Sequence, residues 1–388
     1  MTTLDDAAGL ESAAAPAVGH RFPALDGLRG LAALAVVTTH VGFQTGRTGR
    51  PGALGGVLAR GDFGVTVFFL LSGFLLYRPM SRGGVVVRTY ARRRALRVLP
   101  AYWVAVLLSF LLLPSNAHQP WSAWWEHLLL VQVYLETQLP DGLTQMWSLC
   151  TEVAFYLLLP VFAAAVVRRR RNQPIGGRVD LLALAVLAAV GVLWTALAAG
   201  PSWISPSARL WLPGYLDWFA LGMALAVLHH RVQRRPQDRV STWLAELGRA
   251  PGTCLAVALL LLLLAATPLG GPRLLDPPTH LEAVLKHLLY GASALFLLLP
   301  AVFAPTEGTL WTRLLSSRPL HLVGQVSYSV FALHLVVLYF VLEAVTGGPF
   351  RGQFWTVWVV TSGASLVVAA VSYRLVERPL TDLGRRSR

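Results

Sequence analysis

Residues 25–40 read LDGLRGLAALAVVTTH, and this stretch contains both the apolar length and the polar side chains that decide the fold. Its small and aliphatic residues favour a helix that crosses most of a bilayer core of ~30 Å. Arg29 and His40 are eleven residues apart in it. Because a helix turns by about 100° per residue, eleven residues make about three turns. Both side chains therefore share one face, about 16 Å apart along the axis.

Apolar blocks of similar length recur along the whole chain. Of the 388 residues, 55% are hydrophobic and only 13% are charged, against about 25% charged in soluble domains. Backbone in lipid must satisfy its own hydrogen bonds, so each block is expected to be a helix. We expect an all-α integral membrane protein with about ten transmembrane helices in one bundle. The expected spans are 24–42, 63–79, 98–114, 145–167, 180–199, 209–228, 251–268, 282–303, 325–346 and 355–376.

The remaining segments complete the expected domain organisation. We expect a flexible cytoplasmic tail at 1–22, a transmembrane domain at 23–379 and a basic cytoplasmic tail at 380–388. Residues 121–136 (WSAWWEHLLLVQVYLE) are too polar and too short for a span. Their tryptophans favour a helix that lies in the membrane interface.

The distribution of basic residues predicts the orientation. With the N-terminus in the cytoplasm, 24 of the 33 Lys and Arg residues lie in cytoplasmic segments and 5 in the opposite loops. Such an excess marks cytoplasmic loops, so both termini are expected in the cytoplasm and the protein in the plasma membrane. A net charge of +14 is also typical of nucleic-acid binding. Topology accounts for the loop charges. We therefore expect the lipid bilayer as a partner and do not expect nucleic acid.

Arg29 and His40 are candidate functional groups, because ionisable side chains inside spans are costly. Arg29 is expected near the cytoplasmic end of the first span and His40 near its outer end. This arrangement suits a long phosphorylated donor molecule. Its phosphates would meet the cation at the cytoplasmic end, and its other end would reach the titratable imidazole about three turns deeper. A structural explanation is also open, in which Arg29 pairs with Asp26 one turn earlier and His40 is an interfacial residue.

The fourth span begins with WSLCTEVAFYLLLP (147–160) and places Glu152 near the depth of His40. A buried carboxylate beside a histidine can orient the ring and stabilise the imidazolium. The histidine can then remove a proton from an attacking hydroxyl. Tyr156 follows one turn later on the same face. Alternatively, Glu152 makes a structural hydrogen bond between helices.

The segment after the second span contains an arginine cluster. Arg92, Arg93, Arg94 and Arg97 lie in RRRALRVLPAYW (92–103), where Pro100 is expected in the first turn of the third span. Arginine side chains bind phosphates with paired donors, and coenzyme A carries phosphates. Ordinary positive-inside charge explains the same cluster.

Small residues in the second span, VTVFFLLSGFLL (65–76), predict close helix packing. Gly64, Ser72 and Gly73 allow two helices to approach. Packing is at least as good an explanation for Ser72 as a role in lining an acyl chain.

Other polar groups fall inside or beside the later spans. Asp217 and Lys286 could form a structural pair, and His334 is expected to be a packing or proton-handling residue. Glu377, next to Arg378, is expected in a surface ion pair. The chain has no phosphate-binding P-loop, GxSxG motif or zinc-ligand spacing, so no metal is expected.

Seven motifs, in order and over nearly the whole chain, resemble the acyltransferase family 3 integral membrane acyltransferases. They are LDGLRGLAALAVVTTH, VTVFFLLSGFLL, RRRALRVLPAYW, WSLCTEVAFYLLLP, YLDWFALGM, GQVSYSVFALHL and VERPL. The resemblance implies a ten-helix core, an acyl-CoA donor and O-acylation of sugars or sugar-bearing molecules. It makes Arg29 and His40 the essential pair, with His40 as general base. Arg94 and Arg97 match the family's R-x-x-R element, and Glu152 matches the glutamate of its W-S-L-x-x-E element.

The function expected is O-acyl transfer from acyl-CoA, with acetyl-CoA the first choice, to a glycan, glycolipid or macrolide hydroxyl. The donor phosphates would bind Arg29, Arg94 and Arg97, and His40, oriented by Glu152, would deprotonate the acceptor. In a variant of this mechanism His40 is acylated first. The full set of expected residues is His40, Glu152 and Arg29 for catalysis and Arg29, Arg93, Arg94, Arg97, Ser72 and Tyr156 for donor binding.

Two other classes of function are compatible with many spans and intramembrane charges. One is a transporter or flippase of a carbohydrate-like molecule, which inverted repeats and broken helices would favour. The other is a catalytically inactive sensor, which an intact Arg29, His40 and Glu152 disfavours. The sequence names neither the acyl group, nor the acceptor, nor an oligomeric state.

Overall fold

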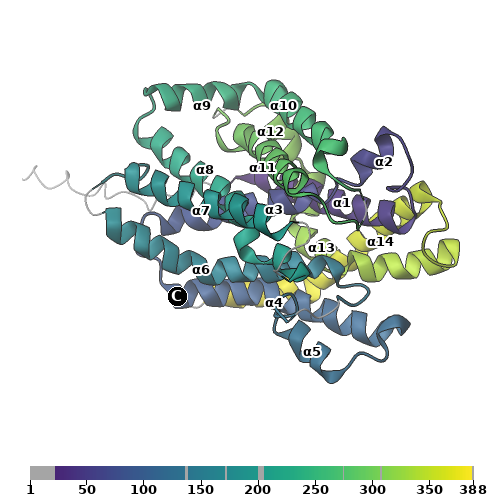
Figure 1. Ribbon diagram of the computed structural model, residues 1–388. Coiled ribbons are helices and arrows are strands. Elements are labelled where there is room, and N and C mark those ends of the chain that lie inside the picture. Colours follow the sequence, from purple (N-terminus) through teal and green to yellow (C-terminus); the bar gives the residue numbers. More distant parts are fainter. Residues whose placement is uncertain are drawn as a thin grey trace, which may run out of the picture.

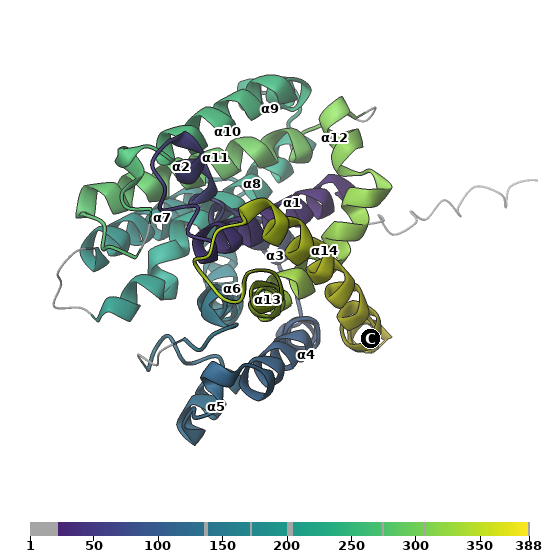
Figure 2. The ribbon, with the colours of Figure 1, turned by 90° about the vertical axis from the view of Figure 1, so that its right-hand side faces the viewer.

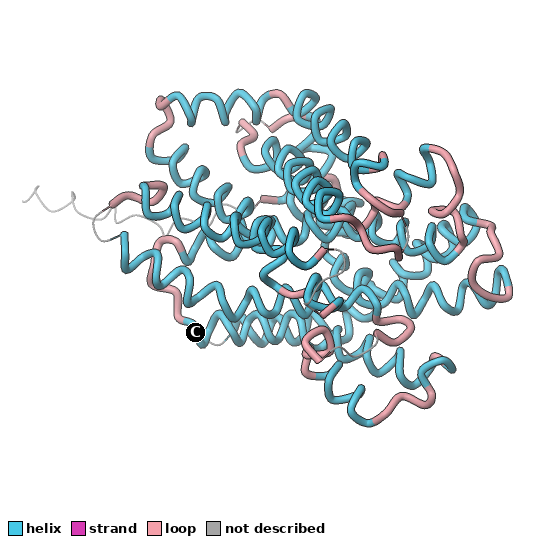
Figure 3. The backbone as a smooth tube through the Cα atoms, viewed as in Figure 1, coloured by secondary structure: helices cyan, strands magenta, loops and turns pink. Residues whose placement is uncertain are grey.

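The chain folds into helices joined by loops (Figure 3). The computed structural model describes residues 22–135, 139–170, 173–199, 205–273, 275–305 and 308–386, and no strand occurs among them. The α-helices are α1 (Pro23–Gln44), α2 (Ala53–Leu58), α3 (Phe63–Met80), α4 (Val87–Leu112), α5 (Trp121–Leu128), α6 (Trp147–Arg170), α7 (Arg178–Ala198), α8 (Leu216–Arg234), α9 (Arg239–Arg249), α10 (Pro251–Ala265), α11 (His280–Val302), α12 (Leu310–Leu315), α13 (Arg318–Thr346), α14 (Phe354–Ser372) and α15 (Arg378–Arg386).

The long helices confirm the expected all-α membrane bundle. Within the described ranges, nine helices are long and apolar enough to cross a membrane. The helices α9 and α10 would provide a tenth span, but they meet at a bend of 84°. The side of the membrane that each terminus faces stays a prediction. Residues 1–21 of the expected tail lie outside the described part, and the expected basic tail at 380–388 begins within α15.

Two expected boundaries differ from the structure. The helix α4 begins at Val87 rather than at residue 98, so the arginine cluster lies on a helix and not in a loop. Pro100 consequently lies inside α4 rather than in its first turn. Proline is tolerated inside membrane helices because neighbouring groups satisfy the freed backbone carbonyl. In the stretch 121–136, the helix α5 is short and projects from the main bundle beside the end of α4 (Figure 1).

The first helix lies in the middle of the bundle (Figure 2). It packs on α13, α3 and α14, and its buried positions include Ala33, Val37 and Val41. Because α1 is surrounded on several sides, the polar side chains that it carries are only partly exposed. This burial brings Arg29 and His40 next to residues from distant parts of the sequence.

Glycines allow the central helices to approach closely, as expected for Gly64 and Gly73. A Cβ atom at Gly64 would lie 2.3 Å from the backbone oxygen of Ala32 in α1, and one at Gly73 would lie 2.3 Å from that of Phe219 in α8. These distances are far below van der Waals contact. Helix packing in lipid depends on such close backbone approach, because lipid offers no hydrophobic force that drives helices together.

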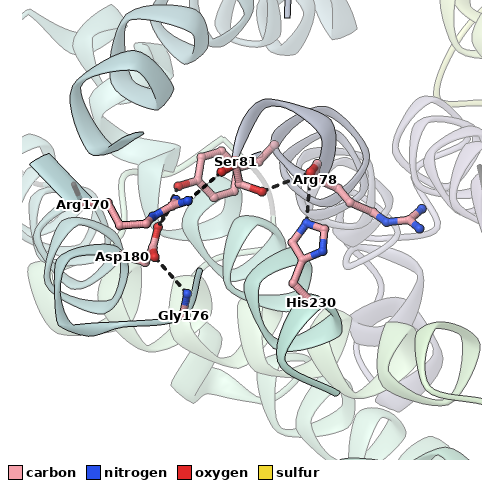
Figure 4. A network of polar contacts seen from close by, with 7 residues as sticks. Arg78, Ser81, Arg170, Gly176, Asp180 and His230 are labelled. Atoms are coloured by element: carbon pink, nitrogen blue, oxygen red, sulfur yellow. Dashed lines mark hydrogen bonds and ion pairs between the residues drawn. The ribbon is translucent and has the colours of Figure 1, made fainter. Parts of the chain in front are cut away.

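A buried ion pair joins the helices at the end of the bundle where α3 and α6 finish and α7 begins (Figure 4). Arg170 donates to Asp180 Oδ1 over 2.7 Å and to the backbone oxygen of Ser81 over 2.8 Å. His230 of α8 lies in the same region, with Nε2 3.1 Å from the backbone oxygen of Arg78. These bonds connect four helices and fix the arginine-rich end of the bundle.

We expect Gly73→Ala to lower the thermal stability of the purified protein. The added methyl group must displace the α8 backbone, and overpacking of this kind costs about 1–3 kcal/mol. Gly363→Ala in α14 is the matched control, because a Cβ atom there meets nothing within 4 Å. Melting curves in detergent would measure both variants. Equal melting temperatures would contradict the close α3–α8 contact.

Candidate active site

A pocket among α1, α3, α4, α6 and α13, here called the arginine pocket, contains several of the expected site residues. Two guanidinium groups and one carboxylate face it, surrounded by tyrosine and phenylalanine rings. Its lining residues are Arg29, Val65, Phe68, Phe69, Leu71, Ser72, Arg97, Val98, Ser148, Leu149, Glu152, Tyr156, Tyr328 and Phe331. Five of the sequence motifs described above therefore meet at one place, although they are far apart in the chain.

Glu152 is the centre of a hydrogen-bond cluster in the arginine pocket. Ser72 of α3 donates to Glu152 Oε1, and the Tyr156 hydroxyl donates to the same oxygen over 2.6 Å. No hydrogen bond joins Glu152 to His40 among the described residues, where His40 Nδ1 contacts Val36 and His334, and the expectation that Glu152 orients His40 stays a prediction. Glu152 instead links α3 to α6 and places one negative charge beside the pocket's arginines.

Arg29 and Arg97 supply the positive charge of the pocket. Arg29 Nε is buried and has no hydrogen-bond partner among the described residues, and the same holds for Arg94 Nε. The alternative ion pair between Arg29 and Asp26 does not occur among the described residues, and the carboxylate of Asp26 lies 3.4 Å from Nδ1 of His321. Buried donors without partners are costly, so an anion entering the pocket would satisfy them.

The arginines of α4 do not all face the same way. Arg94 lies close enough to Tyr90, Tyr156 and Glu152 to interact electrostatically with them. Arg93 points toward the C-terminal helix, where Nε donates to the backbone oxygen of Gly384 over 3.4 Å. Arg93 lies outside the lining of the arginine pocket, and its expected role in donor binding stays a prediction.

His40, which is partly exposed, forms a pair with the buried His334, and no pattern in the sequence linked the two. His40 Nδ1 lies 3.0 Å from His334 Nε2 and 3.0 Å from the backbone oxygen of Val36. His334 Nδ1 lies 2.9 Å from the backbone oxygen of Phe331. Phe331 also lines the arginine pocket, so the histidine pair is linked to the pocket through this residue. His40 itself is outside the pocket's lining.

Tyr328 is a pocket residue that sequence reasoning missed. Its hydroxyl donates to the backbone oxygen of Val98 in α4 over 2.7 Å, which ties α13 to the helix that carries the arginines. The signal available was its position in GQVSYSVFALHL, six residues before His334. Six residues make about 1.7 helical turns, so the spacing does not place Tyr328 on the face of His334, and it does not say which helix the tyrosine faces.

Two expected pairings are wrong. Lys286 bonds to Asp62 over 2.7 Å rather than to Asp217, and Asp217 bonds to His287 over 3.0 Å. Glu377 is not at the surface: it is 5% exposed and accepts a hydrogen bond from Ser329. Groups of three or more His, Cys, Asp or Glu side chains that could hold a metal do not occur in the described part of the chain.

Comparison with known proteins agrees with this geometry. A family model described as an acyltransferase domain matches residues 22–374. The chain belongs to acyltransferase family 3. This match confirms the family that the seven motifs resemble. The matched residues include those of both the arginine pocket and the histidine pair.

Curated relatives extend the family assignment. The chain is 24% identical over 395 residues to "Peptidoglycan O-acetyltransferase OatA" of Listeria monocytogenes, covering 93% of this chain and 56% of the relative. It is 26% identical over 399 residues to "Putative peptidoglycan O-acetyltransferase YrhL" of Bacillus subtilis, covering 95% and 56%. "Acyltransferase MdmB" of Streptomyces mycarofaciens is 38% identical over 154 residues, covering 37% and 39%. The chain thus spans about half the length of the relatives that it matches.

Proposed function

We propose that this protein is a multi-pass membrane O-acyltransferase that moves an acyl group, most simply acetyl, from a coenzyme A thioester to a hydroxyl of a glycan-like or macrolide acceptor. One observation carries the proposal. Arg29, whose buried Nε has no hydrogen-bond partner among the described residues, lines a pocket, and the same helix carries a paired histidine about 16 Å further along. Family membership supports acyl transfer over the flippase alternative.

The arginine pocket would bind the phosphate-bearing end of the donor. Arg29 and Arg97 line it, and the buried Nε of Arg94 adds a third donor close by. Guanidinium groups bind phosphate oxygens with short, charge-assisted hydrogen bonds. Glu152 counters part of this charge, so the arginines stay close together when the pocket is empty. We infer that the donor enters from the cytoplasm, because basic residues favour that side for this end of the bundle.

The acyl arm of the donor would extend along α1 and α3 toward His40. A pantetheine arm is a flexible chain of suitable length for the separation of about 16 Å between Arg29 and His40. Val65 and Phe68 of α3 line the pocket along this route. The thioester carbonyl would then lie near the imidazole while the phosphates stay on the arginines.

The chemical step proposed uses His40 as base and then as acid. His40 Nε2 removes the proton of the acceptor hydroxyl while that oxygen attacks the thioester carbonyl carbon. The C–S bond of the resulting tetrahedral intermediate breaks, and the thiolate takes the proton back from the imidazolium. The products are the acyl ester and free coenzyme A thiol, and His40 returns to its neutral form.

The relatives support two classes of acceptor. The two proteins whose printed names concern peptidoglycan match nearly the whole of this chain, whereas the acyltransferase MdmB matches 37% of it. A polyhydroxylated glycan is therefore the first acceptor to test, and a macrolide the second.

We expect His40→Ala and His40→Gln to lower acyl transfer by about a hundredfold or more, because a positioned general base contributes 10²–10⁴-fold. The assay measures free coenzyme A thiol released by the purified protein when acetyl-CoA and an N-acetylglucosamine oligomer or a macrolide are both present. His118→Ala, at an exposed histidine, is the control and keeps full activity. Undiminished transfer by well-folded His40 variants would refute the role of His40.

We expect Arg97→Ala and Arg29→Gln to weaken acetyl-CoA binding by about tenfold each, because each removes a charge-assisted bond to phosphate. Calorimetric titration of the purified protein gives the dissociation constants. Arg93→Ala provides the comparison on the same helix, because Arg93 contacts Gly384 and not the pocket. If Arg93→Ala weakened binding as much as Arg97→Ala, general positive charge would explain the affinity and the pocket would not.

A further inference from the structure

A second pocket lies among α3, α6, α7, α8 and α11 and is here called the aromatic pocket. Trp147, Tyr215 and Trp218 belong to motifs described above, but the sequence did not group them into a site, and the donor does not need this pocket. Its lining residues are Asp62, Val65, Trp147, Thr195, Ala198, Ala199, Arg209, Leu210, Gly214, Tyr215, Trp218, Pro278, Ala283, Lys286, His287 and Tyr290.

Large rings form a continuous wall in this pocket. The centroids of Trp147 and Tyr215 are 5.1 Å apart, those of Tyr215 and Trp218 are 5.2 Å apart, and Tyr290 lies 6.3 Å from Trp218. Aromatic surfaces with a few polar groups at fixed positions are typical of small-molecule sites. Rings of this kind offer apolar faces together with hydroxyl and indole N–H groups.

A charged pair faces the same space. Asp62 Oδ2 accepts from Lys286 Nζ over 2.7 Å, and Asp62 Oδ1 accepts from the Tyr290 hydroxyl over 2.6 Å. The side chains of Lys286 and Asp62 remain 31% and 42% exposed. Charges in membrane helices face the bundle interior or a water-filled cavity, so this pair gives the aromatic pocket hydrogen-bonding groups for a hydroxylated ligand.

The aromatic pocket adjoins the proposed reaction site. Val65 lines both pockets, and Trp147 of the aromatic pocket directly precedes Ser148 of the arginine pocket. The carboxylate of Asp62 also interacts electrostatically with His40. The two pockets therefore share part of their wall.

We propose that the aromatic pocket is the acceptor site and binds a carbohydrate-like ring with several hydroxyl groups. This inference rests on the proposed acyl transfer and adds the place and chemistry of the acceptor. The rings would stack on the apolar face of a sugar, and the Asp62–Lys286 pair would bond to its hydroxyls.

Filling the pocket tests the acceptor site. Ala283→Trp places an indole in the aromatic pocket, and Leu288→Trp places the same group on the exposed face of the same helix, where Leu288 is 48% exposed. With acetyl-CoA as donor and an N-acetylglucosamine tetramer as probe, we expect Ala283→Trp to raise the acceptor KM at least about tenfold. Acetyl-CoA affinity should change by less than about twofold in both variants.

The outcomes separate this inference from the proposed function. An unchanged acceptor KM in Ala283→Trp, with transfer still abolished by His40→Ala, would overturn the acceptor site alone. Loss of a co-purified phospholipid from Ala283→Trp without a change in KM would also overturn it and make the pocket a lipid site. If His40→Ala retained full transfer, the proposed function itself would fall.

The histidine pair carries a second, independent inference about which nitrogen of His40 reacts. Among the described residues, the polar contacts of His334 Nδ1 are the backbone oxygens of Val330 and Phe331, so this nitrogen carries a hydrogen. Neutral His334 then presents a lone pair on Nε2. His40 Nδ1 faces that lone pair and the Val36 oxygen, so it must donate.

We infer that His334 is a positioning residue that keeps the reactive lone pair of His40 on Nε2. The tautomer of a histidine is set by the hydrogen bond of its other nitrogen. When His40 takes up the acceptor proton, its Nδ1–H bond to His334 becomes charge-assisted and stronger. The Val36 oxygen shares the hydrogen but sits on the same helix and does not fix the ring against α13.

Two substitutions of His334 separate this role from simple packing. His334→Gln keeps an acceptor oxygen near the position of Nε2, and His334→Leu does not. We expect His334→Leu to lower kcat about tenfold or more and His334→Gln to restore it to within about threefold. Nitrogen-15 spectra of the histidine rings, assigned by their loss in His40→Gln, should show a protonated Nδ1 and a free Nε2 for His40 in the natural protein and in His334→Gln. A protonated Nε2 in the natural protein, or equal activity of the two variants, would overturn the inference.

Discussion

The cost of placing charge inside a membrane governs how this protein is built. Each buried ionisable group needs a partner, and most of them have one: Arg170 bonds to Asp180, and Lys286 bonds to Asp62. Arg29 differs, since it has no ion-pair partner among the described residues, its buried Nε makes no hydrogen bond there, and it lines a pocket. An unsatisfied donor in such a setting is expensive. An anionic ligand that accepts a hydrogen bond from this donor would remove the cost. We therefore interpret the arginine pocket as a binding site and the Arg170–Asp180 pair as a structural contact.

Close packing of the central helices makes this arrangement possible. Gly64 and Gly73 bring α3 against α1 and α8 so closely that no side chain fits between them. The space that this saves lets polar residues from α1, α3, α4, α6 and α13 converge on one pocket. The same packing holds α13 against α1, so that His334 reaches His40 from a position 294 residues away in the sequence.

The sequence predicted what depends on local pattern and missed what depends on helix rotation. Apolar length gave the spans, because a bilayer of fixed thickness demands about twenty apolar residues whatever the neighbours are. Motif content gave the family, and the grouping of Arg29, Ser72, Arg97, Glu152 and Tyr156 in one pocket follows from those motifs. Partner choice did not follow, since a small rotation of a helix decides whether Lys286 meets Asp62 or Asp217. The start of α4 was also missed, because its first turns are too basic to look like a span.

The two pockets bear on whether transfer is direct or passes through an acylated histidine. A relay through His40 is useful when donor and acceptor must occupy the same space in turn. Here Val65 lines both the arginine pocket and the aromatic pocket, and the proposed donor and acceptor sites are separate, so under this proposal both substrates can be present together. In the proposed mechanism only Nε2 of His40 has a lone pair for the reaction. If Nε2 attacked the thioester, it could not at the same time accept the proton of the acceptor hydroxyl. Simultaneous occupancy therefore favours direct attack by the acceptor oxygen, with His40 moving only the proton.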